Sequence, residues 1–578
     1  MKRDRTNRGV TFTAVFFYIA LSILFSTQAR AQADAIQTNV PALKTVYAHD
    51  FYIGCILSYR HVGFPDDPVV PGQSPVIAPN GGNLVRFHMN SMSPGNNMKA
   101  ENTLDIAASA AAYAAASTQA LKDSADIHPV VRFNVDMIAQ LNWAKRQGFT
   151  FRGHVLIWHQ QTPAQFFRSG YTTSGTRLTK EKMIQRMDHY LHEIIRLIHE
   201  GWPGLFSAMD VVNEAVNDGT GTDRTTGTEW YSTFGDNSYI MKAFELVRKY
   251  TVQYSETQMK LYYNDYNTEN PAKADGIVRV CGPIFRAGYL DGIGLQGHDA
   301  IGRPTAAQWI AAYNKFDPIC SEMAITEYYV EQGTTRPTAA DLAAQANQYA
   351  MLFKLYIERS AFSGRGKIIN CTKDGLNDQY DFRPTTLSHL WNPNNQCKPA
   401  FYAVANVGIH YNELDSLIFH ADSLHQNDYT AESWSPFAVA LATAKNAMSQ
   451  NYSASVSAAD ALGDAKDALE TAVDGLVKTS SDIQIADNLD PDGFELLQNY
   501  PNPFNANTTI EFSLSEGSDI RLEVFDVTGR VVADLAHGNY SIGHYKVDFN
   551  GLNLESGTYF YKLAAGKKNC VKKLLLLK

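Results

Sequence analysis

The sequence predicts three folded parts: an α/β part built as a closed (β/α)8 TIM barrel, then a small three-helix bundle, and last an antiparallel β-sandwich. The 578 residues are too many for one hydrophobic core, since such cores stop growing near about 250 to 300 residues. Between about 36 and 411, short apolar runs alternate with helical stretches, which indicates parallel strands joined by crossover helices. After residue 411 the pattern becomes helical and then strand-like.

Eight segments of the first part are predicted strands. They lie at 51–57, 85–92, 151–159, 208–215, 260–267, 290–298, 322–330 and 366–371. Two of the helices between them, at 133–148 and 342–360, place apolar residues at helical spacing. Eight strands fit a closed barrel better than an open doubly wound sheet, which usually carries a glycine-rich phosphate turn after its first strand. The sequence has no such turn.

The remainder divides into three segments. Residues 412–477 contain three stretches with apolar residues three and four apart, a spacing that predicts three short helices. This module resembles the FIVAR modules of secreted glycan-active enzymes, and we interpret it as a spacer. A polar linker is expected at 478–493, and alternating residues at 494–578 predict the sandwich.

The first 33 residues are interpreted as a signal peptide. Basic residues are followed by an apolar run from about Val10 to Phe25 and by small residues at Ala29, Ala31 and Ala33. An N-terminal membrane anchor is the alternative. No later segment offers about 18 uninterrupted apolar residues, so no stable membrane span is expected. A net charge of -9 provides no basic surplus for nucleic acid.

The six cysteines lack the paired C-x-x-C spacing of a zinc site, so no metal is predicted. Cys371 and Cys397 flank one expected loop and are the first candidates for a disulfide. Burial of both as free thiols remains an equal alternative.

Two glutamates occupy the positions that glycoside hydrolysis requires. Retaining hydrolysis needs one carboxylic acid and one carboxylate about 5 to 5.5 Å apart. Glu214 follows the apolar pair Val211-Val212, and Glu327 follows Ala324-Ile325. Each therefore lies where a buried strand becomes polar, at the catalytic rim of a barrel. Either could alternatively be a solvated residue at a strand end.

Five segments taken together point to a function more specifically than either glutamate does alone. They are FRGHVLIWHQQ (151–161), AMDVVNEAVND (208–218), LYYNDYN (261–267), DGIGLQGH (291–298) and AITE (324–327). In order and spacing the set resembles glycoside hydrolase family 10, over roughly residues 45–411. The resemblance implies a retaining endo-1,4-β-xylanase that cleaves xylan without a cofactor. A retaining β-glycanase for another glucan or a decorated xylan is the alternative, and a non-catalytic glycan-binding protein is a third.

The resemblance assigns roles to individual residues. It implies that Glu214 is the acid/base, Glu327 the nucleophile and Asn213 the contact to the sugar 2-hydroxyl, with His298 beside the nucleophile. The expected substrate-binding residues are Asn96, Lys99, His154, Trp158, Gln296 and Tyr266. His159 is expected to contact these residues, rather than the sugar, and to hold them in place. Because Gln296 and His298 are two apart, we expect one strand to point both side chains to the same side, and His154 and Trp158 likewise.

Three positions depart from the family pattern. Gly95 replaces a glutamate, Tyr329 replaces an aspartate, and Asn370 is the nearest occupant of a tryptophan position. The sugar-binding contacts on the glycone side, the non-reducing side of the cleaved bond, are therefore expected to be reduced.

The C-terminal residues resemble the sorting domain of type IX secretion substrates. The segments that carry this resemblance are LLQNYPNPFNANTTIEF, DVTGR, SGTYFYKL and KKLLLLK. The resemblance implies the type IX machinery as a partner and passage through the periplasm to the cell surface or the medium. A sugar-binding sandwich is the competing interpretation. We expect the protein to be a monomer.

Overall fold

The computed structural model describes residues 36–62, 71–72, 80–379, 386–478, 484–487, 493–552 and 554–578. The predicted signal peptide at 1–33 lies outside these residues and stays a prediction. The chain forms two compact units. One holds the described residues up to Ser416 together with Ala444–Lys466, and the other holds Leu417–Thr443 and Asp467–Lys578. Within the described ranges, no helix is both long and apolar enough to cross a membrane.

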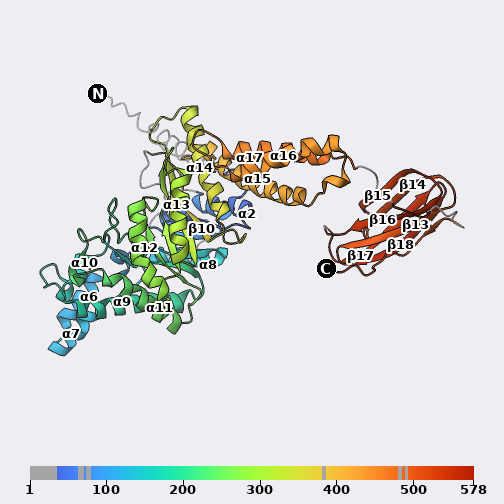
Figure 1. Ribbon diagram of the computed structural model, residues 1–578. Helices are drawn as coiled ribbons and strands as arrows, with labels where there is room; N and C mark the ends of the chain where they lie inside the picture. The colour runs from blue at the N-terminus through green and yellow to red at the C-terminus, as the bar shows by residue number, and fades with distance from the viewer. Residues whose placement is uncertain are drawn as a thin grey trace, which may run out of the picture. The chain divides into compact units, whose positions relative to one another are not determined.

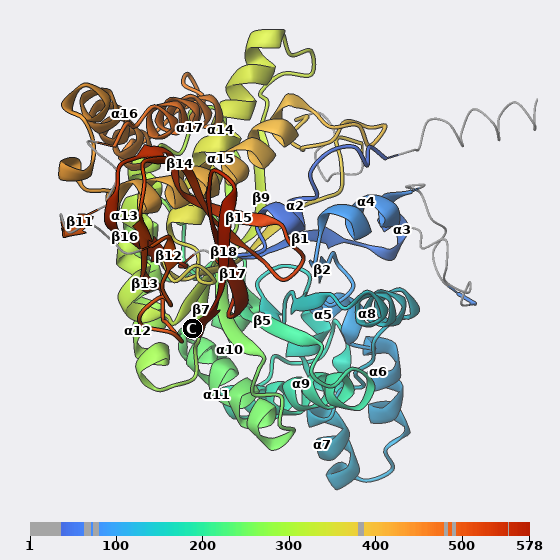
Figure 2. The same cartoon turned by 90° about the vertical axis from the view of Figure 1, so that its right-hand side faces the viewer.

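The first unit contains the predicted closed barrel of parallel strands (Figures 1 and 2). The strands of the ring are β1 (Tyr52–Leu57), β2 (Ser91–Pro94), β3 (Thr150–Gly153), β5 (Phe206–Asn213), β6 (Lys260–Asp265), β7 (Gly292–Leu295), β9 (Glu322–Glu331) and β10 (Ile368–Asp374). Pairing of β10 with both β1 and β9 closes the ring. All carboxyl ends of the strands therefore meet at one mouth, which is where a barrel places its chemistry.

Helices connect the strands and surround the ring (Figure 1). They are α2 (Leu43–Val46), α3 (Tyr59–Val62), α4 (Gly81–His88), α5 (Ala100–Thr103), α6 (Ile106–Ala115), α7 (Gln119–Ile127), α8 (Val135–Gln147), α9 (Lys180–Gly201), α10 (Glu229–Phe234), α11 (Ser238–Gln253), α12 (Pro271–Arg286), α13 (Ala306–Phe316) and α14 (Ala339–Glu358). Local sequence fixes their starts: the Thr338 side chain accepts a hydrogen bond from the Asp341 amide, and the Asp341 side chain accepts one in return.

The predicted strand at 85–92 is partly wrong. Residues up to His88 form α4, and β2 begins at Ser91. The helix buries His88 together with Leu84 and Val85, which precede it by four and three residues, so the helical period outweighs the short apolar run.

Two other predicted strands are interrupted. Segment 151–159 forms β3 and the short β4 (Ile157–Trp158), and segment 290–298 forms β7 and ends at the start of β8 (His298–Ala300). Gly297 has a φ of +71° between β7 and β8. A Cβ there would also lie 3.0 Å from Cγ2 of Ile325, so this turn needs glycine.

The barrel interior below the mouth is filled by side chains. Ala208, Tyr262 and Ala324, from β5, β6 and β9, form a buried cluster. The Arg152 guanidinium lies 4.2 Å from the centre of the Tyr262 ring and is paired with the buried Asp210. The mouth therefore opens above a packed floor.

Three helices follow the barrel strands: α15 (Pro399–Asp422), α16 (Ala431–Ser449) and α17 (Ala458–Asp474). The predicted domain boundary at residue 411 falls inside α15. Asn412 donates a hydrogen bond of 3.1 Å to the buried Asp50, and Asp415 pairs with Arg365 at 2.5 Å. The part of α15 just beyond residue 411 is thus tied to the barrel. The FIVAR-like nature of this module stays a prediction.

The C-terminal residues form the predicted sandwich of two antiparallel sheets. One has the order β11-β16-β13-β12, and the other β15-β14-β17-β18. The strands are β11 (Gln484–Asp487), β12 (Glu495–Leu496), β13 (Asn507–Leu514), β14 (Ser518–Phe525), β15 (Val531–Tyr540), β16 (Gly543–Asn550), β17 (Gly557–Ala565) and β18 (Lys568–Leu576). Ile510, Leu522 and Leu563 are among the side chains of its core, which is buried between the two sheets.

All six cysteines are free thiols, so the candidate pair Cys371 and Cys397 is not a disulfide. Cys371 is buried in β10, and Cys397 is partly exposed. Burial raises the pKa of both thiols, which keeps them protonated and unreactive at neutral pH.

Candidate active site

Glu214 lies at the carboxyl end of β5 in a left-handed turn. Its φ is +55°, a conformation that a non-glycine residue adopts only when its surroundings hold it. The Glu214 amide donates to the Asn264 carbonyl at 2.9 Å, and its carbonyl accepts a hydrogen bond of 2.7 Å from Nε of Arg224. These two contacts fix the backbone, so that the side chain enters the barrel mouth.

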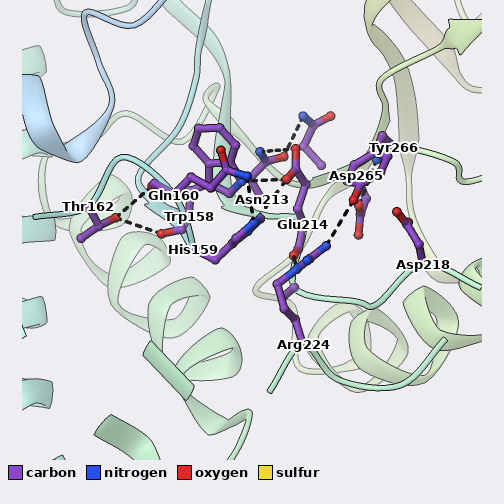
Figure 3. Close-up of polar contacts among 12 residues, drawn as sticks. Trp158, His159, Gln160, Thr162, Asn213, Glu214, Asp218, Arg224, Asp265 and Tyr266 are labelled. Carbon is purple, nitrogen blue, oxygen red and sulfur yellow. Dashed lines mark hydrogen bonds and ion pairs between the residues drawn. The ribbon is translucent and has the colours of Figure 1, made fainter. Parts of the chain in front are cut away.

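The Glu214 carboxyl accepts three hydrogen bonds (Figure 3). Asn213 Nδ2 and Gln296 Nε2 donate to Oε1 at 3.1 and 2.9 Å. Trp158 Nε1 donates to Oε2 at 2.9 Å. Oε1 thus has two donors and Oε2 one, which leaves Oε2 as the oxygen that can carry a proton toward a ligand.

Glu327 lies in β9, with a mostly buried carboxyl. Asn264 Nδ2 donates to its Oε1 at 3.1 Å. Its Oε2 lies 3.3 Å from Nε2 of His298, a contact that is an ion pair when His298 is protonated but does not have hydrogen-bond geometry. Burial raises the pKa of Glu327, but the neighbouring His298, His154 and Lys99 outweigh burial and hold this pKa well below its ordinary range. Glu327 is therefore an anion, the state that its predicted role as nucleophile requires.

Amide side chains link the two carboxyl groups. Asn264 Nδ2, which bonds Glu327, also donates to Oδ1 of Asn213 at 3.0 Å, and Asn213 in turn bonds Glu214. Thr326 donates to Oδ1 of Asn264 at 2.6 Å and fixes the orientation of this amide. Sequence reasoning missed Asn264. The signal was present, because Asn264 lies inside the quoted segment LYYNDYN (261–267), next to Asp265 at the end of β6.

His154 approaches the nucleophile from β3. Its Nε2 lies 3.9 Å from Oε1 of Glu327, and its Nδ1 lies 2.9 Å from the carboxylate of Asp210. Asp210 is fully buried and also paired with Arg152. Because the Asp210 carboxylate accepts a hydrogen bond from Nδ1, the ring proton of His154 lies on Nδ1. The lone pair of Nε2 therefore points toward the site. Sequence reasoning missed Asp210 as well.

Two of the expected sugar-binding residues, Lys99 and Trp158, meet at one side of the mouth. The Lys99 ammonium lies 4.6 Å from the centre of the Trp158 ring, a cation–π contact. Burial lowers the pKa of Lys99, while Glu327 and Glu214 oppose this effect. Asn96 lies in the loop after β2, three residues before Lys99, and is partly exposed.

The same-strand argument for two pairs of residues is wrong. Gln296 lies beyond the end of β7 and bonds Glu214, whereas His298 opens β8 and faces Glu327. His154 and Trp158 are likewise separated by the break between β3 and β4. All four still reach the mouth, because each break follows a barrel strand at its carboxyl end.

His159 lies nearer the acid than expected. Its Nδ1 is 3.9 Å from Oε2 of Glu214, and its Nε2 lies 3.3 Å from the Gln160 amide nitrogen (Figure 3). Burial lowers the pKa of His159 to about 4, helped by Arg224 and Lys273. The ring is therefore neutral near pH 7. Because the Gln160 amide can only donate, the proton of His159 resides on Nδ1, toward Glu214.

Tyr266 lies on the opposite side of the mouth. Its hydroxyl accepts a hydrogen bond of 3.4 Å from Arg224, and the Lys273 ammonium lies 3.7 Å from its ring centre. Lys273 is buried and paired with Asp265 at 2.8 Å. Tyr266 and His298 also line a cavity of about 490 Å³, which gives the mouth a second region for sugar units.

The three departures have different structural consequences. A Cβ on Gly95 would come no closer than 3.5 Å to its neighbours, so a side chain is tolerated there. The Tyr329 ring stacks on His298, with centroids 4.7 Å apart, where the family has an aspartate. Asn370 is buried and donates to Ser91 at 2.8 Å, so it does not cover the mouth. Asp374 also reaches this region: its donor atoms and those of His298 and Glu327 lie within 4.8 Å of one another.

Comparison with known proteins decides the family. The model of glycosyl hydrolase family 10 matches residues 42–407. The chain belongs to glycosyl hydrolase family 10. A second model, the secretion system C-terminal sorting domain, matches residues 498–577 of this family 10 chain. The tail is thus a sorting domain, which indicates secretion to the cell surface or the extracellular space.

Similar proteins are xylanases by name. Endo-1,4-beta-xylanase Y of Acetivibrio thermocellus is 29% identical over 416 residues, 69% of this family 10 chain and 35% of that protein. A putative endo-1,4-beta-xylanase of Caldicellulosiruptor saccharolyticus is 31% identical over 301 residues, 50% of this chain and 94% of that protein. The chain spans 35%, 32% and 54% of the first three curated relatives.

A solved structure shares the barrel. It contains the CBM22-1 and GH10 modules of the N-terminal endo-1,4-beta-D-xylanase 10B of Clostridium thermocellum complexed with xylohexaose. It is 29% identical, with a TM-score of 0.53, and the match covers 63% of this family 10 chain and 67% of that one.

Proposed function

We propose that this chain is a secreted endo-1,4-β-xylanase that cleaves internal β-1,4-xylosidic bonds of xylan with retention of configuration. The observation that carries the proposal is the pair Glu214 and Glu327, linked through Asn213 and Asn264 at the mouth of a family 10 barrel. The names of the similar proteins favour xylan as the substrate. Other β-glucans and decorated xylans are tested beside it.

In the first step a carboxylate oxygen of Glu327 attacks the anomeric carbon. The bond from that carbon to the leaving oxygen breaks, and Glu214 gives its proton to this oxygen. The product is a glycosyl ester on Glu327 and a released sugar chain. The donors that lower the pKa of Glu327 keep it ionised for the attack, and the single donor on Oε2 of Glu214 leaves that oxygen able to deliver the proton.

In the second step water attacks the same carbon. Glu214, now a carboxylate, takes a proton from the water, and the ester bond to Glu327 breaks, which restores both groups. Asn213 supports the transition state through the sugar 2-hydroxyl, a contact that strengthens as positive charge develops on the ring. Lys99, His154 and Trp158 bind the sugar before the cleaved bond, and Tyr266 binds the sugar after it.

The test is hydrolysis of xylan, arabinoxylan, mixed-linkage glucan and cellulose, with the product lengths resolved. We expect xylo-oligosaccharides of several lengths from xylan, because the cut is internal. Glu327→Gln should abolish turnover while the protein stays folded. Turnover of a glucan without turnover of xylan would move the proposal to another β-glycanase, and sugar binding without any turnover would indicate a binding protein.

The partners of the whole chain follow from its two matched regions. We propose that the type IX secretion machinery recognises the sorting domain and that the exported chain acts as a monomer on polysaccharide. Light scattering of the secreted protein measures its mass directly.

A further inference from the structure

A cluster of metal-binding side chains lies on α9, apart from the residues that contact Glu214 or Glu327. His189, His192 and Glu193 are spaced by three and four residues, so one face of the helix presents all three. Their donor atoms lie within 4.8 Å of one another. Two imidazoles and a carboxylate form a donor set that suits Zn²⁺ and similar transition-metal ions.

A second element brings a further imidazole to this cluster. His128 caps the carboxyl end of α7, and its ring lies edge-on to that of His189, with centroids 4.7 Å apart. Its Nδ1 lies 2.7 Å from the Ser124 carbonyl, which can only accept. The proton is therefore on Nδ1, and the lone pair of Nε2 is left for a ligand. Metal-binding histidines typically have this arrangement.

His192 has the same type of support. Its Nε2 lies 2.8 Å from the Tyr254 hydroxyl, and its Nδ1 lies 3.1 Å from Oε1 of Glu193. With these contacts the Glu193 carboxylate can only accept, so the ring proton of His192 lies on Nδ1. When a metal ion takes the place of this proton, the proton moves to Nε2, which then donates to the Tyr254 hydroxyl. Arg196 donates to both oxygens of Glu193, from Nε to Oε1 at 3.2 Å and from Nη2 to Oε2 at 2.7 Å, which keeps the carboxylate charged while Oε1 also faces His192.

His189 completes the set. In the described part of the chain it makes ring contacts with His128 and His192 but no hydrogen bond. Bonds of about 2.0 to 2.1 Å to a zinc ion require donor atoms roughly 3.4 Å apart, which small side-chain rotations can supply.

We propose that His128, His189, His192 and Glu193 bind a divalent transition-metal ion of the zinc class, which ties α7 to α9. Near the same end of α7, Asp126 already pairs with Arg186 of α9 at 2.7 Å. The metal adds a second tie between the same helices, which lie next to each other at the edge of the barrel (Figures 1 and 2). Its role is stability, and it takes no part in hydrolysis.

The test uses the full-length chain without a histidine tag. Titration calorimetry with Zn²⁺ should detect a site whose affinity falls by about a hundredfold or more in the double variant His189→Asn/His192→Asn. Tyr254→Phe removes only the support of His192 and should weaken binding by about tenfold. His199→Asn is the matched control, since His199 lies on α9 and pairs with Glu256 outside the cluster. It should bind Zn²⁺ as the wild type does.

Substitution by Co²⁺ tests the ligands independently. The wild type should give the visible absorption of a four-coordinate ion, and His128→Asn should change the spectrum and lower the affinity. Zn²⁺ should raise the Tm of the wild type but not of the double variant. A second ion at His298, Glu327 and Asp374 would bind all these variants equally, so their differences isolate the α9 cluster. The proposal is overturned if the double variant keeps wild-type affinity or if His199→Asn loses as much.

Discussion

The amide of Asn264 connects the two carboxyl groups, which gives this residue a testable role. Its single Nδ2 group donates to Glu327 and to Asn213. Asn264→Ala should lower kcat/KM for xylan by about 10- to 100-fold, since a hydrogen bond to a charged group contributes roughly 1.5 to 3 kcal/mol. Thr326→Val, which only frees the amide to rotate, should cost less. Equal kinetics for Asn264→Ala and the wild type would remove Asn264 from the site.

His298 is expected to set the acid limit of activity. Burial raises the pKa of Glu327, whereas His298, His154 and Lys99 lower it, and the lowering prevails. Removing one of these three neighbours must therefore raise the pKa of Glu327. His298→Asn should move the acid limb of the kcat/KM profile to higher pH, so that activity is lost earlier as the pH falls. An acid limb that stays in place would show that His298 does not control this ionisation.

Gly95 allows the missing glycone contact to be restored. Its backbone leaves room for a Cβ, and φ is not in the left-handed region. Gly95→Glu should therefore fold and should raise kcat/KM for xylotriose and xylotetraose, because a carboxylate bound to a sugar hydroxyl contributes about 1.5 to 3 kcal/mol. Gly95→Ala is the control for the added Cβ alone. Unchanged short-substrate kinetics in a folded Gly95→Glu variant would indicate that other groups already supply this contact.

At this scale the sequence assigned roles to residues that the family resemblance names, and these roles stay predictions. It missed buried residues of the same segments whose contacts depend on the tertiary structure. Glu214, Glu327 and Trp158 stand in recognisable segments. Asn264 and Asp210 are buried side chains on strands, and only the closing of the barrel brings them next to Glu327 and His154. Asn370 was assigned to the tryptophan position by the family resemblance alone. In the structure β10 pairs with β1, and the Asn370 side chain donates to Ser91 instead.

Among the elements, the turn after β5 holds a non-glycine residue in the left-handed conformation. Glu214 has a φ of +55°, and Nε of Arg224 holds its carbonyl at 2.7 Å. Arg224→Met should lower kcat by about tenfold with little change in KM, because the acid loses its orientation while sugar contacts remain. Arg224→Lys should recover part of the loss. A proportional rise in KM alone would instead place Arg224 in direct contact with substrate.

The strands show where periodicity is a sufficient guide and where it is not. β1, β6 and β9 lie where their apolar runs predicted them. The segment 85–92 was misjudged because a helix ends and a strand begins within it. The break at Gly297 could not be foreseen from alternation, since it depends on the left-handed φ and on the close approach of Ile325.

For the whole molecule, the end of the catalytic part can be located by truncation. A chain that ends at residue 478 keeps α15, α16 and α17, and we expect it to hydrolyse soluble xylan like the full chain. A chain that ends at 411 loses the Asn412 bond to the buried Asp50 and the pair between Asp415 and Arg365. The Tm of this shorter chain should fall by several degrees. Loss of turnover in the folded 478 chain would show that the sandwich is needed for catalysis.

The order of the parts was predictable from the sequence, whereas their limits were not. The barrel and the sandwich each have a distinct periodicity. The segments that resemble family 10 and the sorting domain identified each of these two parts. The helical pattern of α15 continues across residue 411, so no composition change marks where the barrel ends. In the sandwich, exposed residues interrupt the alternation of β15 and β18, and pairing with β14 and β17 places these two strands.

The central claim is that Glu327 forms a covalent bond to the sugar while Glu214 handles the proton. The most direct measurement is mass spectrometry of peptides after reaction with an activated 2-deoxy-2-fluoro-xylobioside, which slows the second step and lets the ester accumulate. We predict one xylobiosyl unit on the peptide that contains Glu327, and none in Glu327→Gln. A label on another carboxylate, or undiminished turnover without any label, would contradict the account.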